Sequence, residues 1–191
     1  MVNVMVAEVA QHRFTVREYH QMGEAGIFTR DDRVELLEGK IYAMSPIGSR
    51  HAACVKRLTQ LFVKKLVDQA IVSVQDPIEL NDRSEPEPDL AILLPRDDFY
   101  EEQHPKPADV LLLIEVSEVT LRFDRTVKLP LYAQNGIAEV WIIDLKKAGV
   151  EVYREPQDGV YGQKLTLKRG QLLTPENLPF LQLTVQELLG K

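Results

Sequence analysis

The sequence predicts an α/β fold in which helices cover both faces of a central sheet. Five β-branched or apolar runs bounded by proline, glycine and aspartate are expected to be strands: residues 71–80, 89–95, 110–117, 138–145 and 150–155. The runs VLLLIEV and VWIID are apolar on both faces, which is typical of buried central strands. A helical segment over 125–136 separates them, as in a β-helix-β crossover between parallel strands.

The elements outside this sheet are also expected from local signals. Thr15 and Glu18 have the spacing of a capping box, which predicts a short helix over 14–26. Gly39 is expected to turn a hairpin between VELLE and KIYAM. Apolar residues at helical spacing predict the longest helix from Ser49 to about Asp68. The C-terminal stretch LPFLQLTVQELLGK fits either a strand or a helix.

Composition indicates one globular domain over residues 1–191, with 45% hydrophobic and 27% charged residues. The chain contains no apolar run of about 18 residues and no signal-peptide pattern, so we expect a cytoplasmic protein without a membrane partner. Its single cysteine, Cys54, excludes an intrachain disulfide. We expect Cys54 to pack inside the protein rather than to act as a nucleophile with His51.

The charge of −6 argues against a protein that coats nucleic acid without specificity. The predicted long helix nevertheless carries five basic residues and no acid between 50 and 67: Arg50, Lys56, Arg57, Lys64 and Lys65. These residues form either a solvated helix face or a strip that faces phosphates. Three histidines have no ligand spacing and are expected at the surface: His12, His20 and His104.

Two carboxylates are expected at one end of the sheet. Asp89 follows Pro88, a residue suited to the start of a strand, and opens an otherwise apolar run. Glu115 shares a strand face with Leu111 and Leu113 by the period of two. Adjacent antiparallel strands would bring Asp89 and Glu115 together, and a shared proton, a cation or a divalent metal would have to relieve their repulsion. Carboxylate oxygens without a histidine pair favour Mg²⁺ or Mn²⁺ over zinc.

Lys128 is a cation that the crossover helix can return to these carboxylates, with Tyr132 four residues on along the same helix face. Pro130 costs about 3 kcal/mol in a helix interior, so this helix either starts near Val127 or kinks at the proline. Two carboxylates, a metal and a lysine can hydrolyse a phosphodiester. The metal activates water and polarises the phosphate, while the lysine orients or deprotonates the water and neutralises charge.

The segments EPDLAILLP and LLLIEVSEVTLRFDRTVKLPLYAQNGIAEVWIIDL resemble the Uma2 family, also called DUF820. This family contains restriction-endonuclease-like proteins of the PD-(D/E)xK nuclease superfamily, and the likeness runs from about Glu35 to Tyr153. It implies an α/β (α+β) fold with a restriction-endonuclease-like mixed central sheet flanked by helices. The nuclease-like core then covers about 35–155, with an N-terminal helix and hairpin and a C-terminal extension.

The resemblance implies that Asp89 and Glu115 are the metal ligands. It also implies that Lys128 replaces the lysine expected two residues after the glutamate, where this chain has Ser117. An upstream acid often completes such a site, and Glu35 matches the family better than Glu38. Four further residues are expected at the edge of the site: His51, Ser117, Asp124 and Tyr132.

Other readings of single residues remain open or are disfavoured. A hydrolase triad built on Ser117 and His51 lacks the Gly-x-Ser-x-Gly elbow. Asp144 is either a cap at a strand end or a residue that supports the site. Trp141 lies within an apolar strand and is expected in the core.

Two functions are compatible with these features. The first is an endonuclease that uses Mg²⁺ (or Mn²⁺) to hydrolyse DNA phosphodiesters, in which Asp89 and Glu115 hold the metal, Lys128 assists the water and Glu35 supports the site. We expect it to be a homodimer, because cleavage of both strands of a duplex needs two sites. The alternative is a catalytically inactive nuclease-fold protein that binds nucleic acid or acts as an interaction module.

Overall fold

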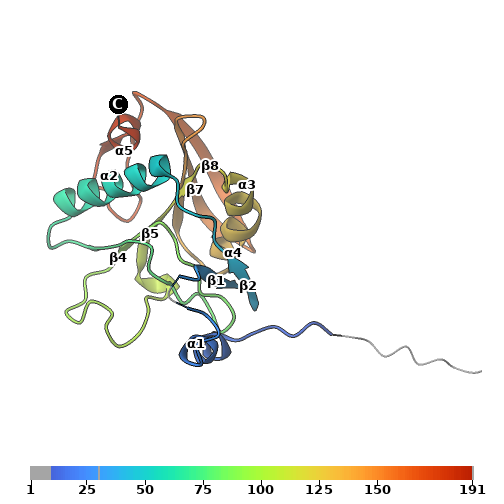
Figure 1. Cartoon of the computed structure of the whole chain (residues 1–191). Coiled ribbons are helices and arrows are strands. Elements are labelled where there is room, and N and C mark those ends of the chain that lie inside the picture. Colours follow the sequence, from blue (N-terminus) through green and yellow to red (C-terminus); the bar gives the residue numbers. More distant parts are fainter. Residues whose placement is uncertain (1–9, 30, 191) are drawn as a thin grey trace, which may run out of the picture.

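The computed structural model describes residues 10–29 and 31–190. Its centre is a six-stranded mixed sheet in the order β3-β4-β5-β6-β7-β8, with helices against both faces (Figure 1). β5 and β6 are parallel, and every other neighbouring pair is antiparallel. The predicted mixed sheet flanked by helices is therefore confirmed. The strands are β3 (Ile71–Ser73), β4 (Leu90–Leu93), β5 (Val110–Ser117), β6 (Glu139–Asp144), β7 (Gly149–Gln157) and β8 (Val160–Lys168).

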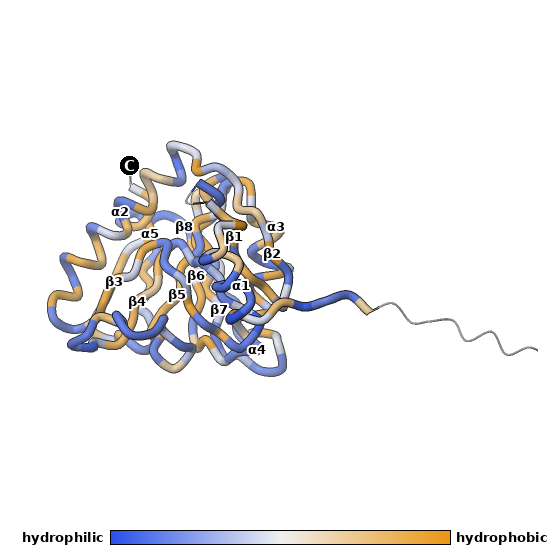
Figure 2. The backbone as a smooth tube through the Cα atoms, turned by 60° about the horizontal axis from the view of Figure 1, so that its bottom comes forward, coloured by the Kyte–Doolittle hydropathy of each residue, from blue (hydrophilic) through white to orange (hydrophobic). Residues whose placement is uncertain are grey.

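Alternate residues of the central strands point into two apolar layers, because successive side chains of a strand face opposite ways. One layer packs under α2 (Ser49–Lys65) and α5 (Val185–Leu189) and includes the fully buried Trp141, as predicted. The other packs under α4 (Leu129–Gln134) and the β1 strand (Val34–Leu37). Hydrophobic residues concentrate along the strands, whereas the surrounding loops are mostly hydrophilic (Figure 2).

The N-terminal elements match their local signals. α1 (Val16–Glu24) begins with the predicted capping box of Thr15 and Glu18. β1 and β2 (Lys40–Ala43) form the predicted hairpin, and both turn residues have positive φ, 49° at Glu38 and 73° at Gly39. Near the C-terminus, β9 (Leu172–Leu173) and β10 (Leu183–Thr184) pair before α5. Among the helices of the described residues, none has the length and apolar character that crossing a membrane requires.

The crossover between β5 and β6 is helical over 121–134 and contains a wide turn. It consists of α3 (Leu121–Phe123), a π-helical turn (Asp124–Lys128) and α4, which starts close to Pro130. The amide of Leu129 donates to the carbonyl of Asp124, five residues back. The proline therefore lies in the first turn of α4, and the π-helical turn carries the chain into it without a break.

Two strands differ from the sequence prediction. β3 ends at Ser73 rather than residue 80, because Gln75 has a φ of 56° and Pro77 lacks the N–H that a ladder requires. β8 was not predicted. Its residues alternate between exposed and half-buried and include lysine, glutamine and threonine, so it lacks the apolar run that marks the other strands.

A β-bulge changes the expected face of Leu111. The register between β4 and β5 shifts between Ile92 and Leu93, so two residues of β5 occupy the space of one. Leu111 consequently packs against the layer under α2 and α5, whereas Leu113 belongs to the opposite layer. The prediction that both share a face was wrong. Glu115 lies beyond the bulge and keeps the face of Leu113.

Candidate functional site

A cavity of about 510 Å³ opens at one end of the sheet. Leu90 of β4 is paired with Ile114 of β5, which places Asp89 and Glu115 next to each other at this end. The hairpin, the start of α2 and the crossover helix complete the walls. The lining includes Glu35, His51, Glu87, Asp89, Glu115, Asp124 and Lys128.

The carboxylate of Asp89 is held by three donors. Its Oδ2 accepts hydrogen bonds from His51 Nε2 at 3.0 Å and from the Val116 amide at 2.8 Å, and its Oδ1 accepts one from Gln75 Nε2 at 3.1 Å. Burial alone would raise the pKa of Asp89, but the bond from His51 and its neighbours outweigh burial and lower it. The same bond raises the pKa of His51. Asp89 is therefore an ionised group with a fixed orientation.

Lys128 lies between two buried carboxylates. Its Nζ is 3.0 Å from Glu115 Oε1 and 3.1 Å from Glu35 Oε2. All three residues are at most 5% exposed. The Tyr132 hydroxyl also donates to Glu115 Oε1, at 2.6 Å. The π-helical turn of the crossover thus carries the ammonium, and the next turn carries the phenol, onto the carboxylate of β5.

The carboxylates of the cavity outnumber its cations. Burial, together with the nearby Asp124 and Asp89, raises the pKa of Glu115 to about 8, and Lys128 only partly offsets this increase. Burial and the nearby Glu35 also raise the pKa of Glu87. Burial would lower the pKa of Lys128, but Glu115 and Glu35 outweigh it and raise that pKa. Lys128 therefore keeps its proton, and the cavity retains capacity for additional positive charge.

The comparisons with known proteins identify the family of this chain. The model of the Uma2 family, described as "Putative restriction endonuclease", matches residues 16–186. The chain belongs to the Uma2 family. A crystal structure described as "a putative nuclease belonging to DUF820" from Anabaena variabilis superposes with a TM-score of 0.70 at 18% sequence identity. It covers 92% of this chain and 97% of its own, so the two share a fold. No protein with a curated functional description matches the chain.

The remaining site-edge candidates of this Uma2 chain occupy different positions. Asp124 lines the cavity, and its Oδ2 accepts hydrogen bonds from Ser117 Oγ at 2.5 Å and from Thr120 Oγ1 at 2.8 Å. Burial raises the pKa of Asp124 despite these donors. Ser117 and Tyr132 contact the site through Asp124 and Glu115, respectively. Glu38 is exposed at the hairpin turn, whereas Glu35 reaches Lys128.

Asp144 and Cys54 have structural roles in this member of the Uma2 family. Asp144 Oδ1 accepts hydrogen bonds from the amides of Lys146 and Lys147, so it caps the end of β6. Cys54 is 1% exposed, and burial raises its pKa to about 11, which leaves the thiol protonated and packed as expected.

Three further residues line the cavity but were not predicted from the sequence: Gln75, Glu87 and Arg33. Glu87 had a detectable signal, because it lies two residues before Asp89 in an extended stretch and such residues share a face. Its amide donates to Glu35 Oε2 at 3.2 Å. No sequence signal indicated Gln75 or Arg33, because their positions depend on contacts between distant segments.

The basic residues of α2 are largely engaged within the chain. Arg57 donates to the carbonyl of Leu189, Lys65 pairs with Glu187, and Arg50 pairs with Glu118. Lys56 and Lys64 are exposed. The helix therefore presents a solvated face whose charges are partly neutralised, rather than a continuous strip of free cations.

Proposed function

We propose that this protein is an endonuclease that hydrolyses DNA phosphodiesters with Mg²⁺ or Mn²⁺ held by Asp89 and Glu115. The observation that carries the proposal is the buried grouping of Glu115, Lys128 and Glu35 beside the ordered Asp89 in one cavity. Membership of the Uma2 family supports it. The enzyme would act as a cytoplasmic homodimer, since each protomer carries one site.

The donor set fits the ion. Asp89 and Glu115 offer hard carboxylate oxygens, the ligands that Mg²⁺ and Mn²⁺ prefer. The raised pKa of Glu115 indicates a carboxyl group with too little compensating positive charge. A divalent ion would supply that charge, polarise the phosphodiester and lower the pKa of a bound water.

The protein's own residues have separate tasks in this mechanism. His51 and the Val116 amide hold Asp89 in one orientation. Lys128 keeps its proton, which favours a role as a fixed cation that stabilises charge on the phosphate in the transition state, rather than a role as the base. Glu35 holds the ammonium in place at 3.1 Å. Tyr132, one helix turn after Lys128, also donates to Glu115 and holds its carboxyl group.

Plasmid cleavage together with calorimetric titration of Mg²⁺ and Mn²⁺ tests the proposal. Asp89→Asn and Glu115→Gln keep the shape of the side chains, and both are expected to lose metal affinity and cleavage. Lys128→Met is expected to lose about 100-fold or more in cleavage, the cost of removing one electrostatic donor. Asp97→Asn, an exposed acid outside the cavity, is the matched control and should cleave like the wild type.

The outcomes separate the two functions considered for this fold. Equal cleavage by the wild type and all three site variants would overturn the assignment of the site and point to a contaminating nuclease. Tight DNA binding without cleavage, at any metal concentration, would favour the inactive nuclease-fold protein. Circular dichroism of each variant shows whether a loss of activity reflects a loss of fold.

A further inference from the structure

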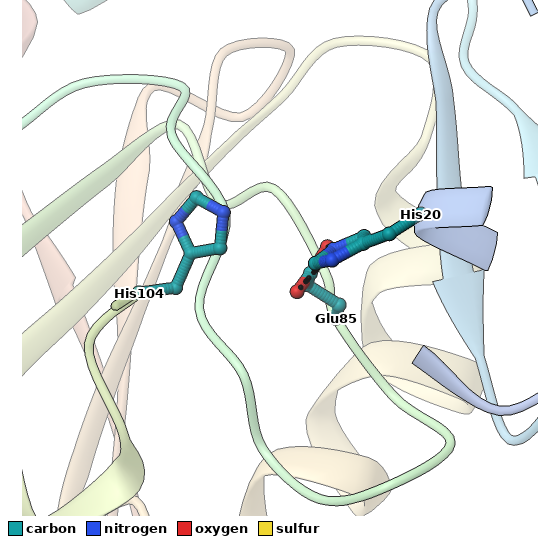
Figure 3. Close-up of side chains that lie close together, drawn as sticks. All are labelled: His20, Glu85 and His104. Atoms are coloured by element: carbon teal, nitrogen blue, oxygen red, sulfur yellow. Dashed lines mark hydrogen bonds and ion pairs between the residues drawn. The ribbon is translucent and has the colours of Figure 1, made fainter. Parts of the chain in front are cut away.

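Outside this cavity, two histidines that are far apart in the sequence lie beside a buried carboxylate. His20 comes from α1, Glu85 from the segment that leads to β4, and His104 from the loop after β4 (Figure 3). His20 Nε2 is 2.8 Å and 3.1 Å from the two carboxylate oxygens of Glu85. One ligand atom from each residue lies within 4.8 Å of the others. His20 lies at the surface, as expected, and His104 is half-buried, but folding brings the two together although the sequence offers no ligand spacing between them.

Glu85 is a buried carboxylate with little positive charge beside it. It is 3% exposed, and among the described residues its only ion-pair partner is His20. A buried carboxylate is costly unless a cation compensates it. An imidazole compensates it fully only when protonated, whereas a divalent metal does so while both imidazoles are neutral.

The chemistry of the three groups selects a class of ion. Two imidazoles and one carboxylate suit Zn²⁺ and related transition metals, and a fourth position would be left for water. Mg²⁺ prefers oxygen ligands alone. Bonds of about 2.0–2.1 Å to a tetrahedral ion place its ligand atoms roughly 3.3–3.4 Å apart, so the wider separations in this group, which reach at most 4.8 Å, would have to contract by roughly 1 Å. His20 and His104 can supply that movement, because His20 is exposed and His104 half-buried.

We propose that His20, Glu85 and His104 form a second metal site, which binds Zn²⁺ or a similar transition metal and clamps α1 and the loop after β4 to the core. The backbone of Glu85 is held in place, because its amide donates a hydrogen bond to the Leu36 carbonyl at 2.7 Å. Four residues later the same segment reaches Asp89. The ion would therefore hold in place the segment from Glu85 to Asp89. Its binding does not depend on nuclease activity.

The test uses the full chain without a polyhistidine tag, stripped with a chelator and titrated with Zn²⁺ and with Co²⁺ as a spectroscopic probe. With excess Mg²⁺ present to occupy the site proposed at Asp89 and Glu115, the wild type is expected to bind one Co²⁺ with visible ligand-field bands, and Zn²⁺ should raise the midpoint of thermal unfolding. His20→Ala and His104→Ala should each lose more Zn²⁺ affinity than the roughly 10- to 100-fold that an outer-shell partner costs.

Two control variants make the result specific. His12→Ala removes an exposed histidine of the same N-terminal region and should bind Zn²⁺ like the wild type. Asp89→Asn removes the proposed Mg²⁺ ligand and should leave the Co²⁺ spectrum unchanged, so failure of one site is distinguishable from failure of the other. Zn²⁺ binding by His20→Ala and His104→Ala with wild-type affinity, or no binding by the wild type, would overturn the second site.

Discussion

At the scale of single residues, the buried charges of this protein depend on one another. Lys128 is 5% exposed, and two carboxylates within 3.1 Å compensate it. Removal of one partner from a buried ion pair leaves the other charge without compensation, which costs more than the pair itself contributes. The lysine is therefore a stability determinant as well as a candidate catalytic group.

We predict that Lys128→Met lowers the free energy of unfolding by about 3 kcal/mol in the absence of divalent metal, because Glu35 and Glu115 then share a buried space without a cation. Urea denaturation in the presence of a chelator measures this change. The double variant Lys128→Met with Glu115→Gln should recover part of the loss, which is the signature of coupled sites. Lys56→Met, which changes an exposed lysine of α2, is the control, and a loss no larger than that of the control would contradict the prediction.

At the scale of elements, an ion pair joins the crossover helix to β7. Arg125 donates to both carboxylate oxygens of Glu151, at 2.8 Å and 2.6 Å, and Lys164 and Tyr153 also contact this carboxylate. Burial would raise the pKa of Glu151, but the hydrogen bonds from Arg125, Tyr153 and Lys164 outweigh burial and lower that pKa from its ordinary value. A carboxyl group with a depressed pKa stabilises the folded state above its unfolded-state pKa, and this contribution disappears as the pH falls through the folded-state value.

We predict that Glu151→Gln destabilises the protein by about 1–3 kcal/mol at pH 7, as expected for hydrogen bonds to a charged group. The difference from the wild type should shrink as the pH falls from the ordinary pKa of a glutamate through the lowered pKa of Glu151, because the wild-type carboxyl then also takes up a proton. Chemical denaturation between pH 3 and pH 7 measures both stabilities. Glu155→Gln, an exposed residue of the same strand, should show no such pH dependence. A constant difference at all pH values would rule out the carboxylate charge as its cause.

At the scale of the whole molecule, the sheet ends in two edge strands, β3 and β8. Edge strands carry unpaired backbone groups that can join a second chain, and closed twofold pairs are the commonest assemblies of soluble proteins. An endonuclease that cuts both strands of a duplex also needs two sites. These considerations favour a symmetric pair of chains.

We predict a homodimer with twice the chain mass of 21.8 kDa in solution. Light scattering coupled to gel filtration measures the mass, with and without Mg²⁺ and a short DNA duplex. A mass of one chain at all protein concentrations would contradict the dimer and would predict nicking rather than double-strand cleavage of a plasmid.

Much of the fold could be predicted from local patterns. The apolar runs of β4, β5 and β6, with proline and aspartate at their ends, specified buried central strands, and the crossover helix between β5 and β6 specified their parallel pairing. These patterns also placed Asp89 and Glu115 at one end of the sheet. Polar β8 was not predictable in this way, because it is exposed over most of its length and is held by pairing with β7.

Tertiary structure decided which charged groups meet. Glu35 and Glu38 are three residues apart, yet only Glu35 points from a strand into the core, while Glu38 lies in the turn. The π-helical turn carries Lys128 to Glu35 and Glu115, and folding alone brings His20, Glu85 and His104 together. Sequence by itself determined the buried central strands and the end of the sheet at which Asp89 and Glu115 lie, because hydrophobic periodicity is local. Long-range packing determined the partners of each charge, because no local pattern encodes contacts between distant segments.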